Sequence, residues 1–283
     1  MGTARLGAVT SRCRPFGRSR SPLTPAWREL RKSRPRHARR PPVVWAGTSR
    51  YARFRDKRYV RREEACEMNE PTVTGSEPSR EASRQFFDRW ARFYGTDPFS
   101  RWIRRAQRRA LEALTLGESD RLLDVGCGPG AAVLEAGPLV TKATGLDLSP
   151  AMIARARSRA GGIGNVEFVE GDSAELPFAD GAFSAVLSTT SFHHYPGPDR
   201  ALDEMRRVLE PSGRIALGDL CSDRLVMRGV DAFCRRYEKG HVHFYETDEL
   251  VALLTAAGFR DVIARSLLAG GYSLVTARSP CPG

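Results

Sequence analysis

From residue 121 onward, short apolar segments alternate with helix-like segments, and this alternation limits the fold more than any other feature of the sequence. The strand candidates are residues 121–125, 143–147, 166–169, 183–188, 214–218, 262–266 and 272–277. Strands separated by helices require right-handed crossovers into a mainly parallel sheet, so the pattern predicts a doubly wound α/β fold. Ligands of such sheets bind beyond the carboxyl ends of the strands, which is where we expect the chemistry.

Several of the intervening helices are marked at their ends. Ser149 precedes the segment PAMIARARSRA as an N-cap, and Pro198 opens a second helix. Thr247 is expected to cap a third helix, which Gly258 ends. These signals support the alternation of strands and helices.

Ahead of the alternating region, residues 79–116 place aromatic and aliphatic side chains at helical spacing. They predict two amphipathic helices with a break just before Pro98. The aromatic side chains are expected either to pack against the main domain or to form a lid, in which Trp90 and Tyr94 stack on a ligand.

The basic residues are concentrated at the beginning of the chain. Residues 1–67 hold 19 of the 45 lysines and arginines but only 5 of the 33 acidic residues, so the remainder is mildly acidic. This stretch is rich in Arg, Pro and Ser and has no hydrophobic periodicity, which predicts a disordered extension. We expect a helical cap at 68–116 and the main domain at 117–283 to follow it.

Three interpretations of the basic extension are open. One is an arm that binds nucleic acid or an acidic surface. Another is an organelle-targeting segment, although its prolines would break the amphipathic helix that such a signal needs. The favoured interpretation is a start set too early, with Met68 as the true first residue, because the composition turns ordinary there.

Cysteine usage and hydropathy bear on the compartment. The six cysteines lie far apart and form no C-x-x-C pair, which favours reduced thiols in a cytoplasmic protein over a disulfide scaffold or a zinc site. No run of 18 apolar residues occurs, so we expect no membrane span.

The first strand runs into a glycine-rich loop, Gly126-Cys127-Gly128-Pro129-Gly130, before the next helix. Glycines let the backbone turn tightly and approach a ligand, and the helix start offers free N–H groups. The spacing also satisfies the dinucleotide fingerprint, so it does not by itself choose the ligand. Asp124, two residues before the loop, favours a ligand with an ammonium or sulfonium group over a pyrophosphate.

Acidic residues also follow the second and third strands. Asp147 could accept both hydroxyls of a ribose, or it could cap the next helix. Asp172 could accept from an exocyclic amine such as that of adenine, with Ser173 offering its backbone N–H to a ring nitrogen. The alternative for Asp172 is an Asx-turn. Three such positions at successive strand ends favour one shared ligand site.

The sequence resembles the class I S-adenosylmethionine-dependent methyltransferases over about residues 120–278. The nearest subgroup is the type-11 group, which includes ubiquinone- and menaquinone-biosynthesis methyltransferases. The resemblance lies in the segments DVGCGPG, GLDLSPAMIARAR, GDSAELPFADGAFSAV, SFHHYPGPDRALDEMRRVLEPSGRIAL and FYETDELVALLTAAGFRDV. It implies a Rossmann-like, doubly wound seven-stranded sheet whose last strand is antiparallel, preceded by a helical cap, with S-adenosyl-L-methionine as the methyl donor.

The resemblance also implies roles for individual residues. Gly126, Gly128 and Gly130 would line the methionine end of the donor, supported by Asp124. The ribose would lie at Asp147 and Leu148, adenine at Asp172 and Ser173, and the reacting sulfonium near Ser188. Two departures from the family pattern, Ser184 and the Ser212-Gly213 turn, do not touch this site.

A general base is needed only if the acceptor must lose a proton. His193 and His194, which follow the fourth strand, are the candidates, although a loop histidine more often makes a structural hydrogen bond. His241 and His243 are weaker candidates. No metal site is expected, because no Cys or carboxylate shows ligand spacing with both histidine pairs.

The favoured function is methyl transfer to a small-molecule acceptor, because the cap is short and the folded part mildly acidic. A nucleic-acid methyltransferase that uses the basic arm is an alternative, but Ser188-Thr189-Thr190-Ser191 stands where base methyltransferases commonly carry a Pro-Pro-aromatic motif. An NAD-dependent oxidoreductase and a donor-binding protein without turnover are also open. The acceptor and the oligomeric state are not determined by these residues.

Overall fold

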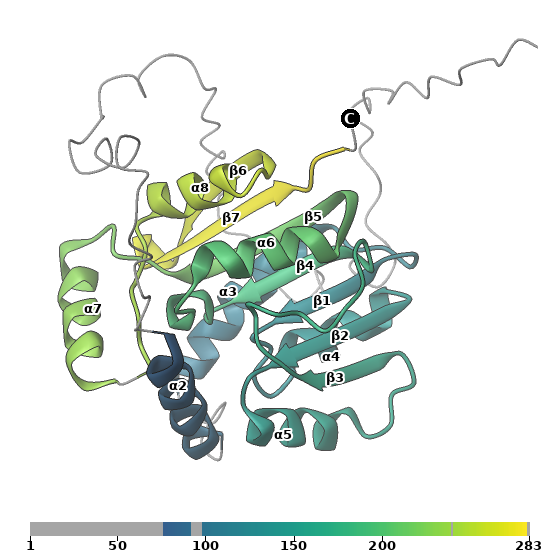
Figure 1. Cartoon of the computed structure of the whole chain (residues 1–283), viewed down its shortest axis with the longest axis horizontal. Coiled ribbons are helices and arrows are strands. Elements are labelled where there is room, and N and C mark those ends of the chain that lie inside the picture. Colours follow the sequence, from purple (N-terminus) through teal and green to yellow (C-terminus); the bar gives the residue numbers. More distant parts are fainter. Residues whose placement is uncertain (1–75, 92–97, 239, 282–283) are drawn as a thin grey trace, which may run out of the picture. The chain divides into compact units, whose positions relative to one another are not determined.

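A computed structural model of the chain describes residues 76–91, 98–238 and 240–281. Seven strands form one sheet in the order β3-β2-β1-β4-β5-β7-β6 (Figure 1). Their bounds are β1 (Arg121–Val125), β2 (Lys142–Asp147), β3 (Val166–Glu170), β4 (Phe183–Thr189), β5 (Leu209–Leu220), β6 (Arg260–Leu267) and β7 (Tyr272–Arg278). The pairings among β1 to β5 are parallel, whereas β7 is antiparallel to both of its neighbours. The predicted Rossmann-like sheet with an antiparallel last strand is confirmed.

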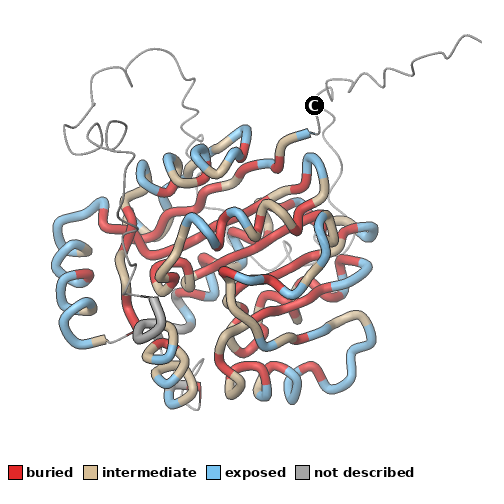
Figure 2. The backbone as a smooth tube through the Cα atoms, viewed as in Figure 1, coloured by how far each residue is buried: buried red, intermediate tan, exposed pale blue. Residues whose placement is uncertain are grey.

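Helices cover both faces of the sheet. Their bounds are α2 (Ser76–Trp90), α3 (Pro98–Leu114), α4 (Ala131–Ala136), α5 (Pro150–Ala160), α6 (Pro198–Val208), α7 (Leu225–Tyr237) and α8 (Thr247–Ala256). Side chains of α6 and α8 share one hydrophobic core with β1, β4 and β5. A smaller cluster joins α3 to the ends of β5 and β7. Every residue of β4 is buried, as expected for a central parallel strand, and Figure 2 shows the buried strands between more exposed helices.

The helix starts agree with the sequence in two of three cases. Ser149 caps α5, because its Oγ accepts from the N–H of Met152 at 3.1 Å, and Pro198 opens α6. Thr247 is not a cap, and that prediction is wrong. Glu246 caps α8 in a capping box with Glu249, while the Thr247 hydroxyl donates to the carboxylate of Asp223.

The two predicted helices of the cap are present as α2 and α3. Their connection, 92–97, and the predictions for the basic extension and for Met68 lie outside the described residues. The sequence pattern does not predict the bounds of α7. Large apolar side chains such as Leu225, Phe233 and Tyr237 are exposed on this helix, so its apolar residues do not mark a buried face. Within the described ranges, no helix combines the length and the apolar character needed to cross a membrane.

Candidate active site

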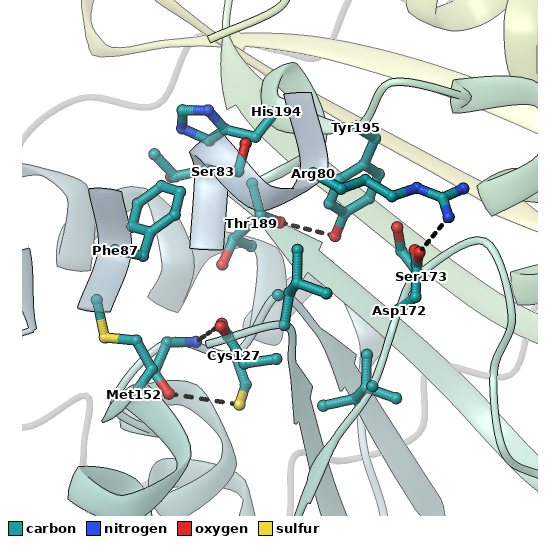
Figure 3. Close-up of a pocket in the computed structure, with 18 of the residues that line it drawn as sticks. Arg80, Ser83, Phe87, Cys127, Met152, Asp172, Ser173, Thr189, His194 and Tyr195 are labelled. Atoms are coloured by element: carbon teal, nitrogen blue, oxygen red, sulfur yellow. Dashed lines mark hydrogen bonds and ion pairs between the residues drawn. The ribbon is translucent and has the colours of Figure 1, made fainter. Parts of the chain in front are cut away.

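A cavity of about 780 Å³, counted with its open mouth, lies at the carboxyl ends of β1 to β4 (Figure 3). The strand order of the sheet reverses between β1 and β4. The crevice at such a reversal is the usual ligand position in doubly wound sheets. The strand ends contribute residues 126–128, 146–148, 171–173, 189–191 and 194–196, α5 contributes Met152, and the cap contributes Arg80, Ser83, Phe87 and Gln107.

The glycine loop is held to the end of β2 by its backbone. The N–H groups of Gly126 and Cys127 donate to the carbonyl of Leu146 at 2.8 and 2.9 Å. Gly126 has φ +74°, and a Cβ there would lie 2.5 Å from the Cβ and the Oγ of Ser191. Gly128 has φ +51°, but a Cβ there would meet no atom within 4 Å. Gly126 therefore permits close packing, whereas Gly128 leaves open space beside the backbone.

Asp147 lines the cavity, and both of its carboxylate oxygens accept from the backbone. The N–H of Gly128 donates to Oδ2 at 2.7 Å, and the N–H of Ser149 donates to Oδ1 at 2.9 Å. Burial raises the pKa of this carboxyl to about 6, against the opposing effect of the two hydrogen bonds. Because Ser149 itself is the N-cap of α5, Asp147 is not the capping residue that the sequence left open.

Asp124 is buried and does not line the cavity. Burial, with a smaller contribution from the nearby charge of Asp147, raises its pKa to about 8. Its Oδ1 has no hydrogen-bond partner among the described residues. The raised pKa favours the protonated form of Asp124 near neutral pH, and an approaching positive charge would favour the ionised form.

At the end of β3, Asp172 and Ser173 both line the cavity. The Oδ1 of Asp172 accepts from the N–H of Ala174 at 2.9 Å, which is the Asx-turn that the sequence left open. Its Oδ2 lies 3.1 Å from Nη1 of Arg80, a side chain that reaches down from α2 (Figure 3). Asp172 thus shapes its own turn and also ties the cap to the sheet.

Beyond β4, a 3-10 turn, η3 (Phe192–His194), carries both candidate bases, whose ring centroids lie 3.9 Å apart. His194 lines the cavity, and its Nδ1–H donates to the carbonyl of Gly240 at 2.9 Å. The ring of Phe87 contacts it edge to face at a centroid distance of 4.8 Å. Burial, reinforced by His193, lowers the pKa of His194 well below its ordinary value, so this imidazole is neutral at physiological pH.

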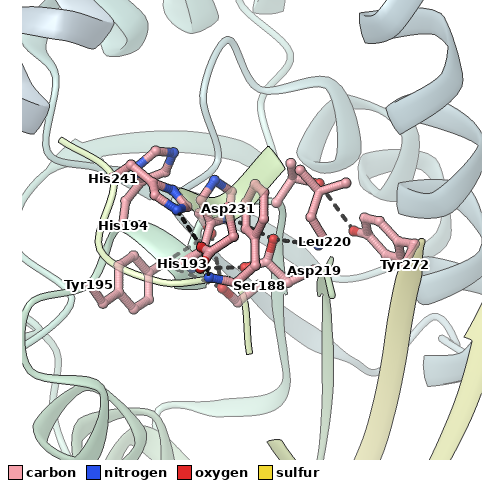
Figure 4. Close-up of polar contacts among 12 residues, drawn as sticks. Ser188, His193, His194, Tyr195, Asp219, Leu220, Asp231, His241 and Tyr272 are labelled. Carbon is pink, nitrogen blue, oxygen red and sulfur yellow. Dashed lines mark hydrogen bonds and ion pairs between the residues drawn. The ribbon is translucent and has the colours of Figure 1, made fainter. Parts of the chain in front are cut away.

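His193 is buried and does not line the cavity. Its backbone N–H and its Nδ1–H both donate to the carboxylate of Asp219, at 2.8 and 2.7 Å (Figure 4). His241 packs against the same pair of rings. His243 is half-exposed, and its ring contacts the carboxylates of Glu249 and Asp231 rather than the other imidazoles. The structure therefore brings three of the four histidines together and leaves the fourth apart.

Two further predicted site residues lie off the cavity. Ser188 is fully buried, with its Oγ 3.1 Å from Oγ of Ser191 and 3.3 Å from the hydroxyl of Tyr195. Gly130 begins α4 and packs against Phe168. Of the predicted donor residues, the cavity is lined by Gly126, Gly128, Asp147, Leu148, Asp172 and Ser173.

Several lining residues were not singled out by the sequence. Phe87 belongs to the aromatic stripe of the cap. Trp90 and Tyr94 are the residues of that stripe predicted to stack on a ligand, and their side chains lie outside the described part of the chain. Arg80 and Tyr195 carry no motif signal of their own. Tyr195 directly follows the histidine pair, and its hydroxyl donates to the carbonyl of Val125 at 3.1 Å.

Comparison with known proteins points to one family. Residues 123–217 match a family model described as a methyltransferase domain. The chain is 33% identical over 178 residues to a demethylmenaquinone methyltransferase of Clavibacter sepedonicus, a match covering 55% of this chain and 71% of that protein. It is 37% identical over 154 residues to the 27-O-demethylrifamycin SV methyltransferase of Amycolatopsis mediterranei (strain S699), covering 51% of this chain and only 56% of that protein.

Among solved structures, the crystal structure of the cyclase SpnF is similar, with a TM-score of 0.61 and 23% identity over 73% of this chain and 98% of that one. At this identity the likeness concerns the fold alone. On the family model and the curated relatives, the chain belongs to the S-adenosylmethionine-dependent methyltransferases. The nucleic-acid and NAD-dependent alternatives receive no support from these comparisons.

Proposed function

We propose that this chain transfers the methyl group of S-adenosyl-L-methionine to an oxygen or carbon of a small, largely apolar acceptor in the cytoplasm. The observation that carries the proposal is the single cavity that collects Gly128, Asp147 and Asp172 from three successive strand ends. The four described cysteines are unpaired thiols, which supports a reducing compartment.

The residues present suit the donor. Each carboxylate oxygen of Asp147 accepts one backbone N–H and has a further lone pair that can accept from a ribose hydroxyl. Asp172 and Ser173 offer an acceptor and a backbone donor to adenine. The open space beside Gly128 admits the methionine end. Asp124 lies off the cavity, so it can act on the ammonium only through space, by giving up its proton. When bound, the donor supplies a methyl group already activated by the sulfonium charge, so the protein has to orient the reactants and exclude water.

The acceptor would lie between the donor and the cap. Phe87, Met152 and Pro196 give that part of the lining an apolar character. His194 is the one predicted base that lines the cavity, and with Nδ1–H committed to Gly240 its Nε2 can accept the proton of an acceptor hydroxyl. His193 would act as a positioning residue beside it. The two relatives named above take demethylmenaquinone and a demethylrifamycin, and such small molecules suit this cavity.

Calorimetric titration of S-adenosylhomocysteine into the full chain tests the donor site. We expect binding by the native chain, and about 10- to 100-fold weaker binding by Asp147→Asn, because the ribose hydroxyls lose an ionised acceptor. Ser149→Ala is the matched control: it removes the cap of α5 beside the cavity, and we expect it to lower thermal stability without changing donor affinity.

Absence of binding by the native chain would overturn the proposal, as would equal affinities of the native and Asp147→Asn chains. A screen of quinone precursors and phenols with methyl-labelled donor then tests turnover. Donor binding without any labelled product would instead indicate that this chain performs another reaction on the same fold. The structurally similar protein SpnF, named as a cyclase, is an example of such a change.

A further inference from the structure

Three imidazoles meet beside the cavity, contributed by two segments far apart in the sequence. His193 and His194 come from η3, and His241 comes from the segment between α7 and α8. One ring nitrogen of each lies within 4.8 Å of one ring nitrogen of the other two. Backbone hydrogen bonds from Val242 and His243 to the carbonyl of His193 hold the two segments together. Figure 4 shows the three rings gathered in one place.

Each ring is oriented by a hydrogen bond from one of its nitrogens to a fixed acceptor. His193 Nδ1 lies 2.7 Å from Asp219, and His194 Nδ1 lies 2.9 Å from the carbonyl of Gly240. His241 Nε2 lies 2.8 Å from Oδ1 of Asp231. Because all three acceptors take the ring proton, the other nitrogen of each neutral ring carries a bare lone pair. Metal-binding histidines show this arrangement, with the outer N–H held by a carboxylate or a carbonyl.

The lone pair of His241 is otherwise unexplained. Its Nδ1 is buried and has no hydrogen-bond partner among the described residues. A positively charged or hydrogen-donating group at this point would satisfy His241 Nδ1.

We propose that His193 Nε2, His194 Nε2 and His241 Nδ1 bind one divalent transition-metal ion of the zinc class. Three neutral imidazoles are a known zinc donor set that leaves a fourth position for water or another ligand. The carboxylate of Glu238, 3.8 Å from His194 Nε2, lies close enough to supply that ligand. Nitrogens around tetrahedral zinc are about 3.3 Å apart, so ring nitrogens that lie within 4.8 Å of one another have to approach by at most about 1.5 Å on binding.

The ion would fasten η3 to the segment around His241 at the edge of the cavity. It would also occupy His194 Nε2, the atom assigned above to proton removal. Metal binding and proton transfer by His194 therefore exclude each other. The binding site itself does not depend on the proposed methyl transfer.

Metal binding is tested on the full chain after chelator treatment and dialysis. Zn²⁺ affinity is measured by competition with a chromophoric chelator, and the coordination by the visible spectrum of added Co²⁺. We expect one equivalent to bind and to raise the melting temperature. His241→Gln keeps an N–H donor for Asp231 but removes Nδ1, and we expect at least about 100-fold weaker binding. His243→Gln is the control, since His243 is half-exposed and is not one of the three clustered rings, although its Nδ1 lies 3.6 Å from Oδ2 of Asp231.

His193→Asn gives an independent variant, because its amide can still donate to Asp219 while Nε2 is lost. We expect it to weaken binding as His241→Gln does, with each variant checked for folding by S-adenosylhomocysteine binding. The proposal is overturned if the native chain binds Co²⁺ no better than the His241→Gln chain, or if His243→Gln costs as much affinity. A spectrum dominated by thiolate bands would assign the metal to cysteines and would also overturn it.

Discussion

The two sides of the cavity are built in different ways. The donor side, residues 126–128, 146–148 and 171–173, consists of strand ends and turns whose carboxylates bond nearby backbone, as Asp147 does with Ser149 and Asp172 with Ala174. The histidine side, residues 192–195 with 240–243, depends on side chains from separate elements, such as His193 on Asp219. Turns and backbone hydrogen bonds between neighbouring strand ends fix the geometry of the donor side, whereas the histidine side depends on side-chain contacts between distant segments. The donor side should therefore tolerate substitutions in the histidine side.

The largest effect is expected at the donor side, from Gly126→Ala. The new Cβ would lie 2.5 Å from Ser191 in a backbone with φ +74°, so both a clash and backbone strain oppose folding. We expect a loss of roughly 3 kcal/mol or more in unfolding free energy and no detectable donor binding. Gly128→Ala, where a Cβ meets nothing, should cost only about 1 kcal/mol but still weaken donor binding. Thermal melts and calorimetry measure both, and equal destabilisation by the two variants would contradict this account.

His194→Asn should separate the two sides of the cavity. The amide can still donate to Gly240, but the nitrogen that would accept a proton is gone. We expect kcat on a hydroxyl acceptor to fall about 100-fold. Donor affinity should stay unchanged, because no donor-side contact involves His194. The rates are measured with a chelator present, which removes any metal effect, and His243→Gln serves as control. An unchanged kcat would remove His194 from proton transfer, and a parallel loss of donor affinity would show that the two sides are not independent.

The same contrast explains how much could be predicted from the sequence. The strands were found because apolar runs mark buried strands, and Ser149 was found because its capping bond spans three residues. The positions of Gly128, Asp147 and Asp172 on one cavity follow from parallel strands ending at the same edge. Local signals and one topological rule were therefore enough for the fold and the donor side.

The remainder depends on contacts that no local pattern encodes. Thr247 looked like a cap, but Asp223 takes its hydroxyl, and Glu246 caps α8 instead. Arg80 reaches Asp172 only after α2 has docked. His241 joins His193 only after the chain has passed through β5 and α7. Spacing along the sequence could not reveal these pairs.

Smaller effects come from titration of the donor side. Asp147, with a pKa of about 6, should bind the ribose hydroxyls only when ionised. Donor affinity should therefore rise about tenfold between about pH 5 and pH 7, whereas Asp147→Asn should show a flat profile there. Because the folded-state pKa is raised, the folded chain binds this proton more tightly than the unfolded chain. The contribution of Asp147 to the unfolding free energy thus falls as pH rises from about 4 to 6. Calorimetry across this range, in buffers of matched ionisation enthalpy, would contradict the assignment if both profiles were alike.

The smallest effect is expected where the cap meets the donor side, from Arg80→Met. This change breaks the 3.1 Å ion pair with Asp172 but keeps an unbranched apolar side chain on α2. Both side chains are partly exposed, and such pairs contribute only about 0–1 kcal/mol, so donor affinity should fall about fivefold at most. The Asx-turn from Asp172 to Ala174 does not involve Arg80 and should keep the adenine side in place. Calorimetry with Arg84→Met as control measures the difference. A loss as large as that of Asp147→Asn would mean that the cap, rather than the strand ends alone, holds the donor, and the donor side would then no longer be a local structure.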